Sequence, residues 1–318
     1  MQTEIVITQI FILAVVVVIG AVAAKFRIFT NDSKDVLSKI IFNISLPLML
    51  FTNFFRLEAS PRLLTNSMII LFLTGFVNLF LFLAGLTASK IMRLRGSEAA
   101  VFKAHSMFGN TIFLGFPLIT ALYGQEGLLY ASMYQLVSSL MLWSIGVVII
   151  SHGNGTTWKR SLMKVFNPNT IATLLGLMCF VFSVKLPSVI LQPMTELGSA
   201  NTWLSMLYIG AILAFSNVGG LLKKASIYLL SFNRLVLVPL ILIILFYLTG
   251  ILTGLAPDKL VTSVIILEVA MPCMVTVVIM AKEFGSDDRL AVANVFVSTI
   301  LSIITLPFIV LVLDKLFA

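Results

Sequence analysis

Apolar residues fill this sequence in long blocks, and charged residues gather in the short stretches between them. A helix that crosses a bilayer needs about 20 apolar residues, and ten blocks meet this length. Eight carry no charge and cover residues 5–24, 63–89, 104–125, 127–151, 165–184, 197–222, 235–257 and 290–313. The other two are 33–55, which is charge-free from residue 40, and 260–281, which contains only Glu268. The pattern predicts an all-α polytopic membrane protein with ten transmembrane helices.

Two of these blocks, the fourth and the ninth, are interrupted near their centres. The fourth contains "GNTIFLGFPLI" and the ninth contains "LEVAMPCMV". Proline removes a helix hydrogen bond and clashes with the preceding turn, and free backbone groups are tolerated at membrane depth only inside protein or beside a watery cavity. We therefore predict that the two broken helices cross and that their exposed helix N-termini bind an anion. The expected substrate-binding residues are Asn110, Thr111, Gly115, Pro117, Met271, Pro272 and Cys273.

The composition excludes an ordinary soluble domain. Hydrophobic residues make up 59% of the 318 residues and charged residues only 11%. In soluble domains, roughly a quarter of all residues are charged. The net charge of +8 could indicate binding to nucleic acid. The positions of the basic residues fit a membrane topology better, so we expect no nucleic-acid partner. Cys179 and Cys273 both lie in apolar blocks and form neither a disulfide framework nor a zinc pattern.

The lysines and arginines give the predicted orientation, because cytoplasmic loops are enriched in them. With the N-terminus outside, 14 of the 21 fall in cytoplasmic loops, 5 in outer loops or at the C-terminus, and 2 (Lys103 and Arg234) within helix ends. We expect a multi-pass protein of the plasma membrane with both termini extracellular. The first block resembles the core of a signal peptide but lacks the basic residues that precede one, so it is interpreted as a retained helix.

The ten blocks divide into two halves of five. Because five is odd, the second half enters the membrane from the opposite side, as an inverted repeat requires. Each half also has a broken helix at the same position, followed by "YGQEG" in the first and "FGSDD" in the second. We predict a first repeat at 1–151, a cytoplasmic linker at 152–164 and a second repeat at 165–318.

Few polar side chains lie inside the predicted helices. Glu268 is the one acid there, and its cost in a bilayer calls for a partner facing the bundle interior. We expect Glu268 and Asn294 to hold a coupling cation, either H⁺ or Na⁺; a neutral Glu268 hydrogen-bonded between helices is the alternative. His105 is equally consistent with a proton relay or a helix-end residue, and Lys103 and Arg234 are expected to extend to the membrane interface. No other cofactor and no metal is expected.

Four stretches spread along the chain resemble the auxin efflux carrier family, which includes plant auxin exporters and bacterial malate and malonate permeases. They are "FNISLPLMLF", "GNTIFLGFPLITALYGQEGL", "NPNTIATLLGL" and "AMPCMV". The short central loop is typical of a prokaryotic member. The resemblance implies a fold similar to bile acid–sodium symporters, with helices 1, 2, 6 and 7 as a scaffold and helices 3–5 and 8–10 as the transport domain. It also implies substrate contacts at Asn110, Thr111 and near Pro117. Family members often have a second proline where this chain has Cys273.

Together these features predict a secondary active transporter of a small organic anion, a mono- or dicarboxylate such as malate. An anion channel and an exporter of an auxin-like substrate remain alternatives. An intramembrane enzyme is disfavoured, because the sequence shows no Ser/His/Asp set and no metal-spaced histidine pair. The expected partners are the lipid bilayer, the substrate and a second copy of the chain bound through the scaffold helices.

Overall fold

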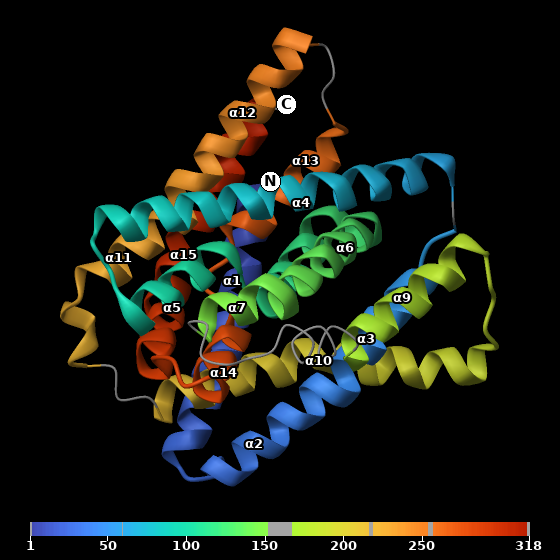
Figure 1. The fold of residues 1–318 in the computed structure, drawn as a ribbon. Coiled ribbons are helices and arrows are strands. Elements are labelled where there is room, and N and C mark those ends of the chain that lie inside the picture. The colour runs from blue at the N-terminus through green and yellow to red at the C-terminus, as the bar shows by residue number, and fades with distance from the viewer. Residues whose placement is uncertain (1, 59, 152–166, 216–218, 254–256, 317–318) are drawn as a thin grey trace.

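The computed structural model describes residues 2–58, 60–151, 167–215, 219–253 and 257–316, and within these ranges the regular structure consists of helices (Figure 1). The linker predicted at 152–164 lies outside them. The α-helices of the first half are α1 (Gln2–Lys25), α2 (Asn31–Ile40), α3 (Leu46–Thr52), α4 (Pro61–Ile91), α5 (Gly96–Met107), α6 (Phe116–Met141) and α7 (Val147–Ile150). Those of the second half are α9 (Pro168–Val181), α10 (Ser188–Phe215), α11 (Ala225–Phe232), α12 (Val238–Thr253), α13 (Lys259–Ala270), α14 (Val275–Glu283) and α15 (Asp288–Leu316).

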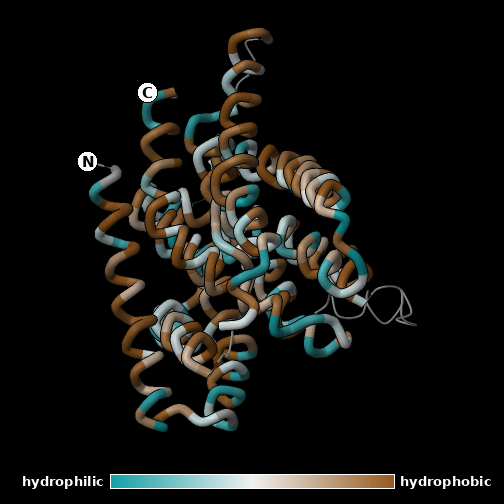
Figure 2. Tube along the Cα trace, turned by 90° about the vertical axis from the view of Figure 1, so that its left-hand side faces the viewer, coloured by the Kyte–Doolittle hydropathy of each residue, from teal (hydrophilic) through white to brown (hydrophobic). Residues whose placement is uncertain are grey.

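Seven helical stretches in the described part of the chain are long and apolar enough to cross a membrane. Figure 2 shows hydrophobic residues along their lengths and hydrophilic residues gathered toward helix ends. The stretches are Glu4–Lys25, Asp32–Phe55, Pro61–Ile91, Thr111–Ile150, Ser188–Phe215, Ala225–Leu252 and Asp288–Leu316. The prediction of an all-helical, polytopic membrane protein is confirmed.

One of these stretches is too long for a single crossing. Thr111–Ile150 has 40 residues, which as a straight helix would span about 60 Å, twice the roughly 30 Å hydrocarbon core of a bilayer. Its backbone leaves the helical conformation at Gly124 (φ 62°, ψ −150°). This positive φ is accessible to glycine at little cost, so Gly124 separates two helical segments inside α6.

Prolines explain most of the irregular turns within the helices. The π-helical turns η1 (Ile41–Ser45), η3 (Thr111–Gly115) and η6 (Asn233–Leu237) each end two residues before a proline, Pro47, Pro117 and Pro239 respectively. A proline cannot donate to the carbonyl four residues earlier and crowds it, so the preceding turn widens to i→i+5 bonds. A fourth π turn, η4 (Leu142–Gly146), has no such proline. These prolines widen a turn and leave the helix continuous.

The helices pack into two groups. In the first, α1 lies along α10, and α3 packs against both α9 and α10. In the second, α4 packs against α5 and α6. Helix α13 packs against α6 and α12, and α15 packs against α11 and α14. Close approach holds α1 to α10, because a Cβ on Gly210 would lie 2.0 Å from the carbonyl oxygen of Val17 and one on Gly20 would lie 2.3 Å from that of Leu207. Contacts of α1 with α6 and α15 join the two groups.

Candidate functional site

The two predicted interruptions lie side by side and are buried within the protein. Helix α5 ends at Met107 and η3 begins at Thr111, while α13 ends at Ala270 and α14 begins at Val275. Between them, Gly109 and Cys273 form an antiparallel bridge. The N–H of Asn110 donates to the Pro272 carbonyl at 2.7 Å, and the N–H of Met274 donates to the Phe108 carbonyl at 3.3 Å. Two short extended segments thus pair at the crossover and satisfy each other's backbone groups.

The break in the fourth predicted helix is displaced from its expected position. We expected it near Pro117, but the helix is interrupted at residues 108–110, where Phe108 is extended and Gly109 forms the bridge, and Pro117 lies in the first turn of α6. The effect of Pro117 is absorbed by the π turn η3, in which the N–H of Phe116 donates to the Thr111 carbonyl. In the ninth helix the break does contain its proline, since Met271 and Met274 on either side of Pro272 are extended.

Arg234 reaches this crossover from η6, although its sequence position suggested a side chain directed to the membrane interface. That expectation is wrong: Arg234 is only 1% exposed. Its Nε donates to the Met271 carbonyl at 2.7 Å, and its Nη1 donates to the carbonyls of His105 and Ser106 at 2.9 Å each. The guanidinium therefore holds carbonyls from the C-terminal ends of both α5 and α13.

Glu268 is fully buried on α13, one turn before the break. Within the described residues neither of its carboxyl oxygens has a hydrogen-bond partner, and the same holds for Nη2 of Arg234. The carboxyl group lies against Gly115, where an added Cβ would come within 2.7 Å of its Oε2. The predicted burial of Glu268 is present, whereas the hydrogen-bonded partner that the alternative interpretation requires is not found among these residues.

A chain of hydrogen bonds links the second break to α15. The N–H of Cys273 donates to Ser298 Oγ at 3.0 Å, and Ser298 Oγ donates to the Asn294 carbonyl at 2.6 Å. The ring of His105 lies 3.2 Å from both the Asn294 amide nitrogen and the Met274 carbonyl. An amide nitrogen can only donate, so Nδ1 of His105 accepts and Nε2 donates. Asn294, which we expected beside Glu268, is thus engaged with His105.

The beginning of η3 presents two of the predicted binding residues. Asn110 caps this helix, because its side-chain oxygen accepts from the N–H of Phe113 at 3.3 Å. Thr111 donates its hydroxyl hydrogen to Gln135 Oε1 on α6, and Gln135 Nε2 donates to Ser139 Oγ at 2.7 Å. Gln135 is a candidate that the sequence analysis missed. Its polarity inside an apolar block was the available signal.

Two cavities lie between the helix groups, offset along α3. The first, here called the Pro117 cavity, measures about 320 Å³ and is lined by Gln9, Met49, Thr52, Asn53, Arg56, Pro117, Thr120, Ala121, Leu128, Ser199, Thr202 and Trp203. The second, the Gln135 cavity, measures about 50 Å³ and is lined by polar residues Gln135, Ser139, Asn167, Asn169, Thr170, Thr173 and Thr276 together with eight apolar side chains. Of the predicted site residues, only Pro117 lines either cavity. Arg234 and Glu268 line neither cavity.

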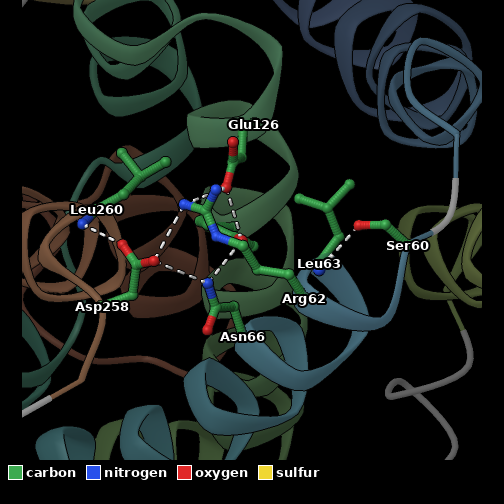
Figure 3. A network of polar contacts seen from close by, with 8 residues as sticks. Ser60, Arg62, Leu63, Asn66, Glu126, Asp258 and Leu260 are labelled. Atoms are coloured by element: carbon green, nitrogen blue, oxygen red, sulfur yellow. Dashed lines mark hydrogen bonds and ion pairs between the residues drawn. The ribbon is translucent and has the colours of Figure 1, made fainter.

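A second polar network lies at the ends of three helices (Figure 3). Arg62 Nη2 at the start of α4 lies 3.0 Å from Asp258 Oδ2 and 3.5 Å from Glu126 Oε1. Asn66 Nδ2 also donates to Asp258 Oδ2. Partial burial acts to raise the pKa of Asp258, but hydrogen bonds from the Leu260 N–H, Arg62 and Asn66 outweigh it, and the pKa lies below its usual value. At other helix ends, Lys224 pairs with Glu98 at 3.3 Å.

Comparison with known proteins places this arrangement in a family. The membrane transport protein family matches residues 5–164 and 154–310, nearly the whole chain. The chain belongs to the auxin efflux carrier family. This confirms the resemblance seen in the sequence, and membership favours transport over catalysis.

Three relatives of this carrier cover nearly the full length. An uncharacterized transporter of Methanothermobacter thermautotrophicus is 29% identical over 300 residues, 92% of this chain and 93% of its own. The uncharacterized transporter MJ1031 of Methanocaldococcus jannaschii is 25% identical, with 93% of this chain and 95% of that protein covered. The uncharacterized transporter YfdV of Escherichia coli is 23% identical, covering 92% and 93%. This auxin efflux carrier homologue is a membrane transport protein, and it therefore acts in a lipid bilayer.

Proposed function

We propose that this carrier is a secondary active transporter that moves a small organic anion across the plasma membrane by alternating access. The observation that carries the proposal is the paired helix break, together with the two cavities between the helix groups. Met274 of the second break lines the Gln135 cavity, and Pro117, which follows η3 on the same chain segment, lines the Pro117 cavity. A site reached from two offset cavities suits a carrier, because each cavity can open to one side while the other closes.

The chemistry at the crossover favours an anion. Helix N-termini carry partial positive charge, and η3 and α14 both begin at the break. Thr276, in the first turn of α14, and the amide side chains of Gln135 and Asn169 line the Gln135 cavity. The buried Arg234 adds a full positive charge. Hydrogen-bond donors and positive potential suit a carboxylate, so a mono- or dicarboxylate such as malate is the proposed substrate class.

We further propose ten membrane crossings in two inverted repeats of five. In support, Gly124 and Gly285 both have positive φ (62° and 71°) in the turns that follow the two broken helices. The N and C labels lie toward the same end of the molecule in both views (Figures 1 and 2), which is consistent with an even number of crossings. The network of Arg62, Glu126 and Asp258 joins three segments that this topology places outside, and the Glu98–Lys224 pair joins two that it places inside.

The two packed groups suggest how the carrier moves. Helices α1, α2–α3, α9 and α10 correspond to predicted crossings 1, 2, 6 and 7, the proposed scaffold, and the group that contains the crossover corresponds to the proposed transport domain. Glu268 in that domain is the proposed coupling residue, exchanging a cation as the domain moves. A buried acid without a hydrogen-bond partner is costly in a membrane, and such a residue is by default a candidate for a functional site.

Ligand-induced thermal stabilisation of the purified carrier tests the substrate class. Mono- and dicarboxylates are screened with and without sodium, and a true substrate raises the unfolding temperature in proportion to its occupancy. Uptake into vesicles then separates a carrier from a channel, since only a carrier exchanges labelled substrate against an unlabelled excess. A screen in which no carboxylate stabilises the protein contradicts the substrate class, and the absence of counterflow contradicts the carrier mechanism.

Labelling from one side of the membrane tests the topology. Single cysteines are introduced at Pro61 and Thr157, and an impermeant thiol reagent is applied to intact cells. We expect only the cysteine at position 61 to react. Equal labelling of both positions in intact cells contradicts the proposed orientation.

A further inference from the structure

The crossover contains backbone carbonyls that have lost their helical partners. Where α5 stops at Met107, the carbonyls of His105 and Ser106 no longer meet the N–H groups of a following turn, and Met271 is in the same situation after α13. Such carbonyls form the negative end of a helix. In a membrane interior each of these carbonyls needs a hydrogen-bond donor or a cation, because no water is available to bind it.

A single side chain meets this need at all three positions. The Arg234 guanidinium donates to Met271, His105 and Ser106 over distances of 2.7–2.9 Å. Its planar, delocalised charge and five donors suit several acceptors in fixed positions better than a lysine would. Arg234 lies in η6, the π turn that ends two residues before Pro239.

The guanidinium also fills the space between the two breaks. A Cβ on Gly109 would lie only 2.0 Å from Nη2, so the backbone of the paired segment rests directly on the arginine. Glu268 lies close enough for its charge to act on Arg234, although the two share no hydrogen bond. Arg234 thus resembles a coordinated cation, with carbonyl oxygens as ligands and an acid nearby.

We propose that Arg234 is a tethered cation that permanently occupies the carbonyl-lined centre of the crossover, so that the carrier binds no Na⁺ there. Arg234 is a positioning residue: it holds the two breaks together and fixes the half-helices whose N-termini face the substrate. A second cation in the same place would meet its full charge at close range. The part of this inference that concerns coupling rests on the proposed function. If no Na⁺ binds at the crossover, the cation that Glu268 exchanges is a proton.

The charge balance supports a proton at Glu268. With Glu268 ionised, the Arg234–Glu268 pair is neutral; a proton on Glu268 leaves one positive charge to attract an anion. The other titratable groups facing these two are Tyr134 on α6, His105 on α5 and Cys273 in the second break. None of these described residues is a second carboxylic acid. Proton uptake and anion binding therefore favour each other, which is the thermodynamic condition for symport.

The first experiment uses the parent protein without substrate. Its unfolding temperature is measured in NaCl and in N-methyl-D-glucamine chloride at equal ionic strength. We expect no difference, whereas saturation of a sodium site would raise the unfolding temperature by several degrees. A sodium-specific increase overturns the proposal. Because no substrate is present, this result does not depend on whether the proposed anion is correct.

The second experiment replaces the arginine. Arg234→Ala removes the tethered cation, and we expect a lower unfolding temperature that low millimolar guanidinium restores in part. Urea, which has the same shape without the charge, is the matched control, and Arg62→Ala is the control for loss of an arginine at the surface. Rescue of Arg234→Ala by guanidinium alone supports the proposal. An unfolding temperature equal to that of the parent, or equal rescue by urea, overturns it.

A third variant covers the case in which Arg234→Ala does not fold. Arg234→Lys keeps the charge but loses the fork of donors, and we expect a folded protein with an intermediate unfolding temperature and no sodium response. If Arg234→Lys is as unstable as an Arg234→Gln variant, charge is irrelevant at this position and the tethered-cation proposal fails. Failure of the carboxylate screen would leave all three results standing, so the two proposals fail separately.

Discussion

Two arginine–carboxylate arrangements in the described part of the chain differ in almost every respect. At the helix ends, Arg62 is 64% exposed and pairs directly with Asp258 at 3.0 Å. At the crossover, Arg234 and Glu268 are completely buried, share no hydrogen bond and leave three polar atoms without partners in the described structure. The exposed Arg62 forms ion pairs with carboxylates, whereas the buried Arg234 donates hydrogen bonds to backbone carbonyls.

The difference separates a structural contact from a functional one. Charges near water cost little to pair and contribute little, about 0–1 kcal/mol. Charges inside a membrane protein cost far more, and we propose that a buried acid left unpaired there is one that changes its protonation state during transport. Glu268 fits that description and Asp258 does not. Each prediction below tests one side of this contrast.

The largest expected effect is that of Glu268→Gln, which removes the charge and keeps most of the shape. If Glu268 exchanges a proton during transport, the variant loses gradient-driven accumulation, and its remaining substrate binding becomes insensitive to pH. Accumulation in energised vesicles and binding to the purified protein measure the two effects. Glu126→Gln, which changes an acid of the exposed network, is the matched control and should accumulate substrate as the parent does. If Glu268→Gln accumulates substrate as the parent does, Glu268 does not couple transport and has only a structural role.

The next effect is steric. Gly109→Ala places a methyl group 2.0 Å from Nη2 of Arg234 and 3.3 Å from the Met271 carbonyl. Overpacking of this kind costs about 1–3 kcal/mol, and here it also separates the paired segments. We expect a clearly lower unfolding temperature and weaker transport. Gly75→Ala on α4 is the control, because a Cβ there meets nothing within 4 Å. If both variants are equally stable, the contact between Gly109 and Arg234 is not present in the membrane.

Substitution of Asn110 should have a smaller effect on stability and a larger one on binding. Asn110→Ala removes the cap of η3, which costs about 0.5–2 kcal/mol, and removes a polar group from the proposed site. We expect roughly tenfold weaker carboxylate binding, equivalent to about 1.4 kcal/mol, measured by titration. Thr30→Ala removes the comparable cap of α2 and should leave affinity unchanged. Equal affinity in Asn110→Ala and the parent would exclude Asn110 from the site.

The sequence predicted the helices well because their signal is one-dimensional. A run of apolar residues identifies a crossing segment without knowledge of its neighbours, and the second predicted block, expected near residue 33, is helical over Asp32–Phe55. The meeting of the two breaks was also predicted from the sequence, because the prediction needed only their equivalent positions in the two proposed halves.

The parts that were missed depend on neighbours. Pro117 was expected at the break, but a proline can end a helix or widen one turn, and the surrounding packing decides between these outcomes. Arg234 was assigned to the interface because it stands at the edge of an apolar block. Its side chain turns inward because orphan carbonyls from α5 and α13 meet there, and those helices lie about 129 and 37 residues away in the chain. No local pattern encodes such a meeting.

The smallest expected effect belongs to the exposed network. Asp258→Asn keeps the cap that accepts from Leu260, since asparagine caps as well as aspartate, but removes the charge facing Arg62. We expect a loss of at most about 1 kcal/mol, seen as a slightly lower unfolding temperature. The folded pKa of Asp258 is lowered, so its stabilisation is present above the unfolded pKa of about 4 and disappears as pH falls through the folded value. The difference in unfolding temperature between variant and parent should therefore become smaller below a pH of about 4. It should also become smaller in high salt, which screens the pair. A loss comparable to that of Gly109→Ala, independent of salt, would show that the network anchors the helix ends, and the contrast with the crossover would no longer hold.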